Sequence, residues 1–534
     1  MNIPALVLGT TWHQQLPVVL DLASSFPHRI VVGGTGRGKT SFLLGLIYQQ
    51  LRRAGGVIFV DGKANPRNLL TLIHLARQTG RWALVRAIFP GEPWSHTYNP
   101  LHEHREIHAA VNFLLNLLPP VSVQSEAQHY RDLVQSFLLK ALEILRATGK
   151  TATLRDVLAM MTAPPQVIEE RFRAELTGSR HHERLSDLYF LTQEILRKNQ
   201  DALSGIVAQL QSILATDLGN FVSTVYSDLD FLSAVDLGQP VYVALPTSGD
   251  PTRANALGRA FLADILAVMA QLTSERRPIP SPPCLVLLDE FGSYVISEFV
   301  EVFRKAREAG LQVVASITNI SDLQDRQKGL TLEYPDMLTG NSSMIFLGSE
   351  SPGTLHFAER YFGDEKQLIQ SYRESLSTNV AGHLASADER FLNPWQGTSR
   401  AVFDQAMEKR EPRLEKELLN RLGNHQAILF FRNRPTLVHL VRYFAPDDVL
   451  SRDPASEVPR LPKTPRQPVA LTDYVREKQI EAATRRAEKG TQKEETKEKA
   501  NVPSPPPTPR PVGRPRGSGR RTPAKSAPPQ TGNS

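Results

Sequence analysis

A glycine-rich stretch near the amino terminus has residue types and spacing suited to polyphosphate chemistry. Residues 30–40 read IVVGGTGRGKT, and Gly33, Gly38, Lys39 and Thr40 match the pattern G-x-x-x-x-G-K-[ST]. Glycines let a turn wrap around phosphates with its N–H groups pointing inward, and a helix that begins there adds free donors. Lys39 can then reach the β- and γ-phosphates of ATP, and the Thr40 hydroxyl can ligate Mg²⁺. The residues expected to bind this nucleotide are Gly33, Gly34, Thr35, Gly36, Arg37, Gly38, Lys39, Thr40 and Ser41.

Two neighbouring acids far along the chain, Asp289 and Glu290, would complete this chemistry. They follow the apolar run 284–288, and an apolar strand that ends in acids is the second half of a phosphate-loop ATPase site. Asp289 can hold the water shell of Mg²⁺ together with Thr40. Glu290 can orient or deprotonate the attacking water. Alone, acids after a core strand are a weak signal; together with the glycine-rich loop they predict ATP hydrolysis.

Both motifs require strand–loop–helix surroundings, and the apolar patterns predict them. Runs of β-branched and other apolar residues indicate buried parallel strands. These runs lie at 30–32, 57–60, 87–89, 240–246, 284–288 and 311–317, with further candidates at 5–8, 18–20, 343–347 and 427–431. Helices are expected from residue 41 onward and at 253–272 and 297–309. The fold class is therefore α/β with a parallel central sheet, and ligands of such sheets bind at the carboxyl ends of the strands.

A block with helical periodicity interrupts this alternation between about residues 102 and 235. Helices are expected at 109–118, 130–145, 153–161, 185–196 and 203–214. Because Lys39 and Asp289 must meet at one site, this all-α block has to be inserted within the nucleotide-binding domain. The expected domains are 1–101 and 236–450 for the two parts of the nucleotide-binding domain, 102–235 for the all-α insertion, and 451–534 for a Pro-rich, charged, mostly disordered tail.

Charge and cysteine content limit the possible functions. The formal net charge is +7, but residues after 450 hold 18 basic and nine acidic side chains, which leaves residues 1–450 slightly acidic. The net positive charge of the protein therefore comes from the tail. A single cysteine, Cys284, excludes an intramolecular disulfide. We expect no membrane span, because the best candidate, 257–272, is interrupted by Arg259 and Asp264.

The order of several motifs resembles a known family. The residues that carry the resemblance are Val32–Thr40, Val60–Lys63, Tyr98–Leu101, Leu287–Phe291, Gly340–Ser342, Ile345–Leu347, Ala427–Phe430 and Arg442–Phe444. Over about residues 1–445 this order is similar to the conjugative coupling proteins of type IV secretion, the TraD/TraG group of the FtsK/HerA motor class. The resemblance implies a RecA-like motor domain, a ring of six identical subunits, and DNA that is pumped through the ring by ATP hydrolysis.

The resemblance also assigns individual positions. Arg307 matches the arginine that reaches the γ-phosphate of a neighbouring subunit in such motors; the alternative is a solvated helix arginine. The family's γ-phosphate-sensing glutamine corresponds to Thr318, and either Thr318 or Asn319 can hydrogen-bond a phosphate or water. The phosphate loop begins at Gly33, which leaves no room for the membrane-spanning helices of many members. A cytoplasmic protein, or one held at the inner face of the membrane by a separate partner, is therefore expected.

The tail contains a candidate for a second DNA contact. Gly513, Arg514, Pro515 and Arg516 resemble an AT-hook, a short extended element that lies in a narrow minor groove. The alternative is a generic basic segment that contacts phosphates or acidic partners. Both interpretations predict salt-sensitive affinity for DNA.

The main functional hypothesis is a DNA-stimulated ATPase that delivers conjugative DNA and its relaxase, or another DNA-processing protein, to a type IV secretion channel. A second hypothesis is a HerA/FtsK-type pump for duplex DNA in DNA processing. A third is an ATP-gated scaffold that tethers DNA without moving it. A neighbouring relaxase gene would favour the first hypothesis, and a neighbouring nuclease gene would favour the second.

Overall fold

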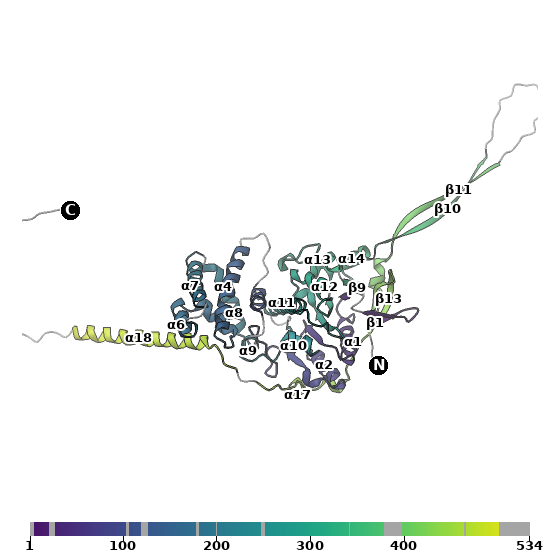
Figure 1. Ribbon diagram of the computed structural model, residues 1–534. Coiled ribbons are helices and arrows are strands. Elements are labelled where there is room, and N and C mark those ends of the chain that lie inside the picture. The colour runs from purple at the N-terminus through teal and green to yellow at the C-terminus, as the bar shows by residue number, and fades with distance from the viewer. Residues whose placement is uncertain are drawn as a thin grey trace, which may run out of the picture. The chain divides into compact units, whose positions relative to one another are not determined.

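The computed structural model describes residues 5–20, 27–102, 106–118, 127–177, 181–198, 200–246, 251–340, 342–378, 398–463 and 466–500 (Figure 1). The chain forms two compact units, Met1–Val475 and Arg476–Ser534. The first unit thus includes residues that the sequence assigned to the tail. The AT-hook-like residues 513–516 lie outside the described residues.

An eleven-stranded sheet, in the order β2-β1-β13-β12-β9-β3-β8-β7-β4-β6-β5, organises the first unit. In this spatial order, the seven neighbouring strands that begin with β9 and end with β5 are parallel to one another. They are β3 (His28–Val32), β4 (Val57–Asp61), β5 (Arg86–Ile88), β6 (Pro240–Ala244), β7 (Cys284–Asp289), β8 (Leu311–Ile317) and β9 (Ser342–Leu347). Each was predicted from its apolar run, so the parallel α/β fold is confirmed.

The other edge of the sheet is antiparallel, which the sequence did not predict. It consists of β1 (Leu6–Thr11), β2 (Pro17–Leu20), β12 (Gln426–Phe431) and β13 (Arg434–Leu440). The β13 strand was missed because it begins with Arg434 and Pro435 and has no continuous apolar run. A tight turn with positive φ at Arg432 and Asn433 joins it to β12. Thus β13 fills the position between β12 and the amino-terminal strand β1.

Both faces of the sheet are buried, as expected for parallel strands. Ile30 and Val32 of β3 belong to one hydrophobic cluster, whereas Val31 belongs to the other. This alternation follows from the two-residue period of a strand. The helices of the motor part are α1 (Lys39–Arg52), α2 (Pro66–Gln78), α11 (Pro251–Ser274), α12 (Val300–Lys305), α13 (Tyr334–Thr339), α14 (Pro352–Phe362) and α15 (Lys416–Asn420).

Short 3₁₀ helices connect several of these elements. They are η1 (Trp82–Leu84), η2 (Phe291–Ser293), η3 (Ser297–Phe299), η4 (Ile320–Leu323) and η5 (Arg326–Lys328). The helix predicted at 297–309 is shorter in the structure, since α12 ends at Lys305 and a turn follows. Among the described residues, α11 is the one helix long and apolar enough to cross a membrane; 67% of its most apolar window is buried inside the protein.

The block between β5 and β6 is all-helical over its described residues. Its helices are α3 (Ile107–Asn116), α4 (Ala127–Ala147), α5 (Leu154–Thr162), α6 (Pro165–Leu176), α7 (His181–Lys198), α8 (Gln200–Leu214), α9 (Asp217–Val222) and α10 (Phe231–Asp236). Because β5 and β6 are adjacent strands, the chain leaves and re-enters the sheet at neighbouring positions. An aromatic cluster of Tyr98, Phe113, Phe231 and Phe261 joins the insertion to α11.

The segment after the sheet packs against both parts of this unit. It contains α16 (Asp447–Leu450) and α17 (Pro454–Glu457), and the indole Nε1 of Trp82 donates to the Glu457 carbonyl at 2.7 Å. Farther along, the Leu471 N–H donates to Asp156 Oδ1 in α5 at 2.9 Å. The long helix α18 (Leu471–Ala500) begins there. A separate hairpin, β10 (Asp364–Thr378) and β11 (Thr398–Pro412), lies between α14 and α15 in the chain (Figure 1).

Candidate nucleotide-binding and hydrolysis site

The predicted phosphate loop connects β3 to α1 at the carboxyl ends of the parallel strands. Gly36 and Gly38 adopt φ values of 78° and 100°, which glycine tolerates and other residues rarely adopt. The Gly34 N–H donates to the Gly348 carbonyl at 2.9 Å, which ties the loop to the end of β9. The buried Lys39 ammonium donates to the Gly33 carbonyl at 2.6 Å. Burial lowers the pKa of Lys39, although nearby carboxylates oppose the shift.

Thr40 and Asp289 meet directly, although 249 positions separate them. The Thr40 hydroxyl donates to Asp289 Oδ2 at 2.8 Å, and the Ser316 hydroxyl donates to Asp289 Oδ1. The Tyr294 hydroxyl donates to the Asp289 carbonyl at 2.8 Å and so holds the end of β7. A hydroxyl and a buried carboxylate oriented toward the same point are oxygen ligands of the kind that Mg²⁺ accepts, directly or through water. These residues therefore fit a nucleotide-bound Mg²⁺.

Glu290 lies beside this pair and is held from two directions. Its backbone is left-handed, with φ 54°, a conformation that is uncommon for residues other than glycine. Lys63 Nζ lies 2.9 Å from Glu290 Oε1, and the Thr318 hydroxyl donates to Glu290 Oε2 at 3.2 Å. Burial alone would raise the pKa of Glu290, but Lys63, Lys39 and Thr318 together bring it below its ordinary value. Glu290 is consequently a carboxylate at neutral pH and can accept a proton or orient a water molecule.

Lys63 is positioned by the neighbouring acid Asp61. Asp61 lies at the end of β4 and pairs in register with Asp289 of β7. The Lys63 N–H donates to Asp61 Oδ1 at 2.9 Å, and the buried Tyr242 hydroxyl donates to Asp61 Oδ2 at 2.7 Å. Burial, and then the charge of Asp289, raise the pKa of Asp61. Asp61 thus shapes the turn that carries Lys63 toward Glu290.

Thr318 occupies the position that the sequence comparison assigned to a γ-phosphate sensor. It follows β8 and lies between Lys39, whose Nζ is 3.5 Å from its hydroxyl, and Glu290, whose Oε2 accepts from that hydroxyl. Asn319 has another role, because it caps η4 together with Asp322. Of the two candidates left open by the sequence, Thr318 is therefore the one whose side chain reaches the site.

Arg307 lies away from its own phosphate loop. It is exposed in the turn before β8, and its charge acts on buried His28 at the start of β3. The starts of parallel strands lie at the edge of the sheet opposite the loop. Arg307 therefore cannot reach Lys39 or Glu290 of the same chain.

Sequence analysis assigned no role to Lys63 or Ser316, which the structure brings into the site. Lys63 was visible as the basic residue after a buried strand that ends in Asp61. Ser316 gave no signal, because it is one small polar residue within an apolar strand. Its proximity to Asp289 depends on the pairing of β7 with β8.

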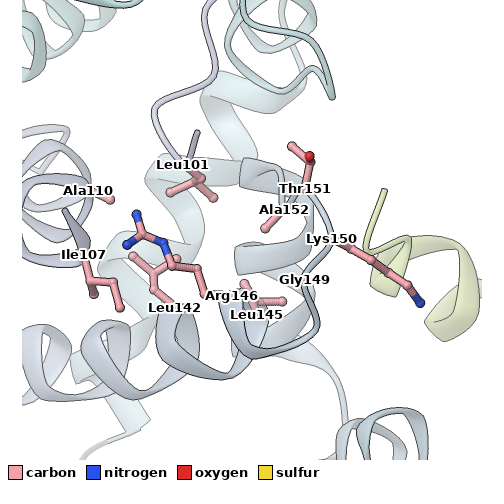
Figure 2. A pocket seen from close by; sticks show the side chains of 10 residues that line it. All are labelled: Leu101, Ile107, Ala110, Leu142, Leu145, Arg146, Gly149, Lys150, Thr151 and Ala152. Atoms are coloured by element: carbon pink, nitrogen blue, oxygen red, sulfur yellow. The ribbon is translucent and has the colours of Figure 1, made fainter. Parts of the chain in front are cut away.

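A separate cavity of about 80 Å³ lies in the helical insertion and involves none of these residues. Figure 2 shows its lining, in which Arg146 is directed between Leu101 and Ile107 while Lys150 points away. The residues that could bind a nucleotide are gathered instead at the carboxyl ends of β3, β4, β7 and β8.

Comparisons with known proteins agree with this geometry. Residues 5–347 match the family model described as type IV secretory system conjugative DNA transfer. The chain is 23% identical over 354 residues to the type 4 coupling protein DotL of Legionella pneumophila; the match covers 56% of this chain and 45% of DotL. The chain therefore spans less than half the length of that relative.

Solved structures of the conjugative coupling protein TrwB share the fold. The unbound form of TrwBdeltaN70 is 18% identical, with 85% of this chain and 92% of that chain covered and a TM-score of 0.55. The TrwB complex with ADP and Mg²⁺ is 18% identical, with 84% and 92% covered and a TM-score of 0.53. The RecA-like architecture expected from the sequence is confirmed by this likeness.

Proposed function

The chain belongs to the type IV secretory system conjugative DNA transfer family, and from that premise we propose that it is an ATP-driven coupling motor that delivers DNA to a type IV secretion channel. The observation that carries this proposal is the convergence of Lys39, Thr40, Asp289 and Glu290 at one edge of a parallel sheet. TrwB has been solved with ADP and Mg²⁺ and with non-hydrolysable analogues of ATP and GTP, which supports ATP and Mg²⁺ as the cofactors here.

The proposed roles follow from the contacts. Loop N–H groups between Thr35 and Ser41 would bind the phosphates, since those of Gly33 and Gly34 already donate to the carbonyls of Ile317 and Gly348. Lys39 would turn from the loop carbonyls to the β- and γ-phosphates. Thr40 and Asp289 would hold Mg²⁺, directly or through water. Glu290 accepts the proton of the attacking water or orients that water.

Arg307 is proposed to act on a neighbouring subunit in a homohexamer. Its exposure and its position at the sheet edge opposite its own loop are compatible with a contact in trans and not in cis. A guanidinium placed against the γ-phosphate would stabilise the charge of the transferring phosphoryl group.

The proposed partners are DNA, a relaxase or another DNA-processing protein as cargo, and the secretion channel. The expected location is the cytoplasm, at the inner face of the membrane where a membrane partner recruits the protein.

The helical insertion at 102–235 is the proposed cargo reader, and the two parts of the motor domain are 1–101 and 236–450. In the tail, Arg514 and Arg516 are proposed to contribute salt-sensitive DNA affinity.

The test is the ATPase rate with and without single- and double-stranded DNA, for the wild type and for Glu290→Gln. Each protein is measured as the full chain and as residues 1–475, because the compact unit extends to Val475. We expect DNA to stimulate hydrolysis, Glu290→Gln to reduce the rate by at least about 100-fold, and stimulation to survive loss of the tail.

Other outcomes identify the alternatives. Nucleotide and DNA binding without any stimulated hydrolysis would contradict a motor and leave an ATP-gated tether. Stimulation that is strongest with duplex DNA, in a chain that does not bind a relaxase, would favour a pump for DNA processing.

A further inference from the structure

A histidine from the end of the sheet domain lies against the phosphate loop, and an exposed phenylalanine contacts that histidine. They are His425, which precedes β12, and Phe444, which follows β13. Their rings meet edge to face, with centroids 5.8 Å apart. Nothing in the proposed hydrolysis mechanism uses either residue, so their position beside the loop calls for a separate explanation.

His425 is fitted closely to the loop. Its backbone N–H donates to the Arg37 carbonyl at 3.2 Å, and its ring Nδ1 lies 3.3 Å from the Ser41 hydroxyl. A Cβ added to Gly38 would lie 2.3 Å from the same Nδ1, which shows how near the imidazole lies to the loop backbone. The His425 backbone is also left-handed, with φ 65°. This conformation is unfavourable for residues other than glycine and is often found at functional sites.

Phe444 is aligned by its own chain neighbours. The Tyr443 N–H donates to the Ser41 carbonyl at 3.1 Å, and the Tyr443 ring stacks on Tyr48 of α1 at a centroid distance of 5.3 Å. The adjacent Phe444 side chain is nevertheless 64% exposed. A single exposed aromatic residue is common on protein surfaces. Here, however, it stands beside a histidine that is held against the phosphate-binding turn.

The sheet order shows which end of a nucleotide would lie there. Glu290, Thr318 and Lys63 mark the γ-phosphate end, and they follow β7, β8 and β4 on one side of β3. β12 and β13 lie on the other side of β3, beyond β9. A triphosphate laid along the loop with its γ-phosphate at Glu290 therefore directs its nucleoside toward His425 and Phe444.

We propose that His425 and Phe444 form the base-binding subsite of the nucleotide site, with the Phe444 ring stacked on the purine and His425 supporting that ring. This inference rests on the proposed function, because it presumes that the loop binds ATP. An exposed ring face beside a neutral imidazole suits a planar, uncharged base; burial, and then the charge of Arg442, lower the pKa of His425 and keep it neutral. Stacking accepts any purine, so the subsite binds ATP and GTP alike.

The test compares ATP with inorganic tripolyphosphate, which has the phosphates without the base. Equilibrium binding is measured in Mg²⁺ for the full chain, Phe444→Ala, and the control Phe190→Ala, which removes a similarly exposed ring, 69% accessible, from α7. We expect Phe444→Ala to weaken ATP binding about tenfold, the usual effect of losing one stacking ring. Tripolyphosphate binding by Phe444→Ala, and both affinities of Phe190→Ala, should stay within about twofold of the wild type.

A second variant gives a direct signal. In Phe444→Trp the stacking ring is kept, so ATP affinity is retained, and ATP quenches the added tryptophan fluorescence whereas tripolyphosphate does not. The proposal is overturned if Phe444→Ala binds ATP as the wild type does, or loses ATP and tripolyphosphate equally. If the wild type binds neither ligand and Lys39→Ala is indistinguishable from it, the proposed function fails and this inference fails with it.

Discussion

Glu290 shows how neighbouring side chains prepare a single carboxylate for catalysis. Three groups from different strands surround it: Lys63 after β4, Thr318 after β8 and Lys39 after β3. Each of these groups favours the charged form of Glu290 over its neutral form, whereas burial has the opposite effect. The Thr318 hydroxyl lies 3.5 Å from Lys39 Nζ and donates to Glu290 Oε2 at 3.2 Å. We therefore expect this hydroxyl to connect the bound nucleotide to Glu290 in place of the family's glutamine.

Replacing Lys63 should change the pH dependence of ATP hydrolysis. In Lys63→Met the burial of Glu290 is no longer opposed by its nearest cation, so its pKa rises. Because the ionised form is the active one, the acid limb of the rate profile should move to higher pH. The measurement is kcat/KM for ATP between about pH 3.5 and 8, a window that begins below the ordinary pKa of a glutamate, about 4.3.

The matched control is Arg304→Met, which breaks an exposed pair with Glu301 at 2.8 Å away from the site. Its profile should overlay that of the wild type, since exposed pairs contribute little. An unchanged acid limb in Lys63→Met would show that this ion pair does not set the protonation of Glu290.

At the scale of elements, α11 supports the acidic end of β7 through one close contact. Gly258 of α11 faces Tyr294, and an added Cβ would lie 2.6 Å from the Tyr294 Cβ. Tyr294 in turn holds the Asp289 carbonyl. Glycine at this position therefore lets the helix approach the segment that carries Asp289.

Gly258→Ala should lower the melting temperature, because overpacking of a buried contact destabilises by about 1–3 kcal/mol. The control is Gly205→Ala in α8, where no heavy atom lies within 4 Å of the added Cβ. That change should leave the melting temperature equal or higher, since alanine favours a helix by about 0.5–1 kcal/mol over glycine. Thermal unfolding of the two variants tests the close contact between Gly258 and Tyr294. An unchanged melting temperature in Gly258→Ala would contradict the role of this contact.

At the scale of the whole molecule, the segment after the sheet is part of the first compact unit. Val458, Val469 and Leu471 are buried, with exposed fractions of 6%, 0% and 0%. Contacts with Trp82 and Asp156 place this segment against the motor domain and the insertion. A boundary at 450 therefore divides a packed region, whereas the compact first unit ends at Val475, within the first turns of α18.

Truncation after residue 475 should leave the melting temperature of the first unit unchanged. Truncation after residue 450 should lower it, because three buried aliphatic side chains, each worth about 1.5–3 kcal/mol, are removed. Scanning calorimetry of the two truncated chains and the full chain makes the comparison. Equal melting of the two truncated chains would contradict the packing role of residues 451–475.

Oligomeric catalysis can be tested by mixing two inactive chains. Arg307→Ala retains its loop and acids, and Lys39→Ala retains its arginine, so a mixed ring contains interfaces where an intact loop faces an intact arginine. ATPase activity should be absent in each variant alone and reappear on mixing. Failure to recover activity in rings shown to contain both chains would argue against a role for Arg307 in trans.

The meeting of Thr40 and Asp289 was predictable because each belongs to a short local pattern. The loop of residues 33–40 needs only its own glycines to turn and the following helix to present donors. The parallel strands are equally local in origin, since strands covered on both faces become continuous apolar runs. The all-α insertion followed from periodicity together with the requirement that Lys39 meet Asp289.

The contacts that tune the site follow from the packing of the sheet and not from local sequence. Lys63 reaches Glu290, Ser316 reaches Asp289 and His425 reaches the phosphate loop because strands distant in sequence are adjacent in the sheet. Strand order and register depend on the burial of the whole sheet and not on any residue's own neighbours. For the same reason β13, which has a weak apolar pattern, was not predicted, and its place is determined by the open edges of β1 and β12. Local sequence patterns thus identify the groups that can act on a nucleotide, and the packing of the sheet sets how those groups are charged and held.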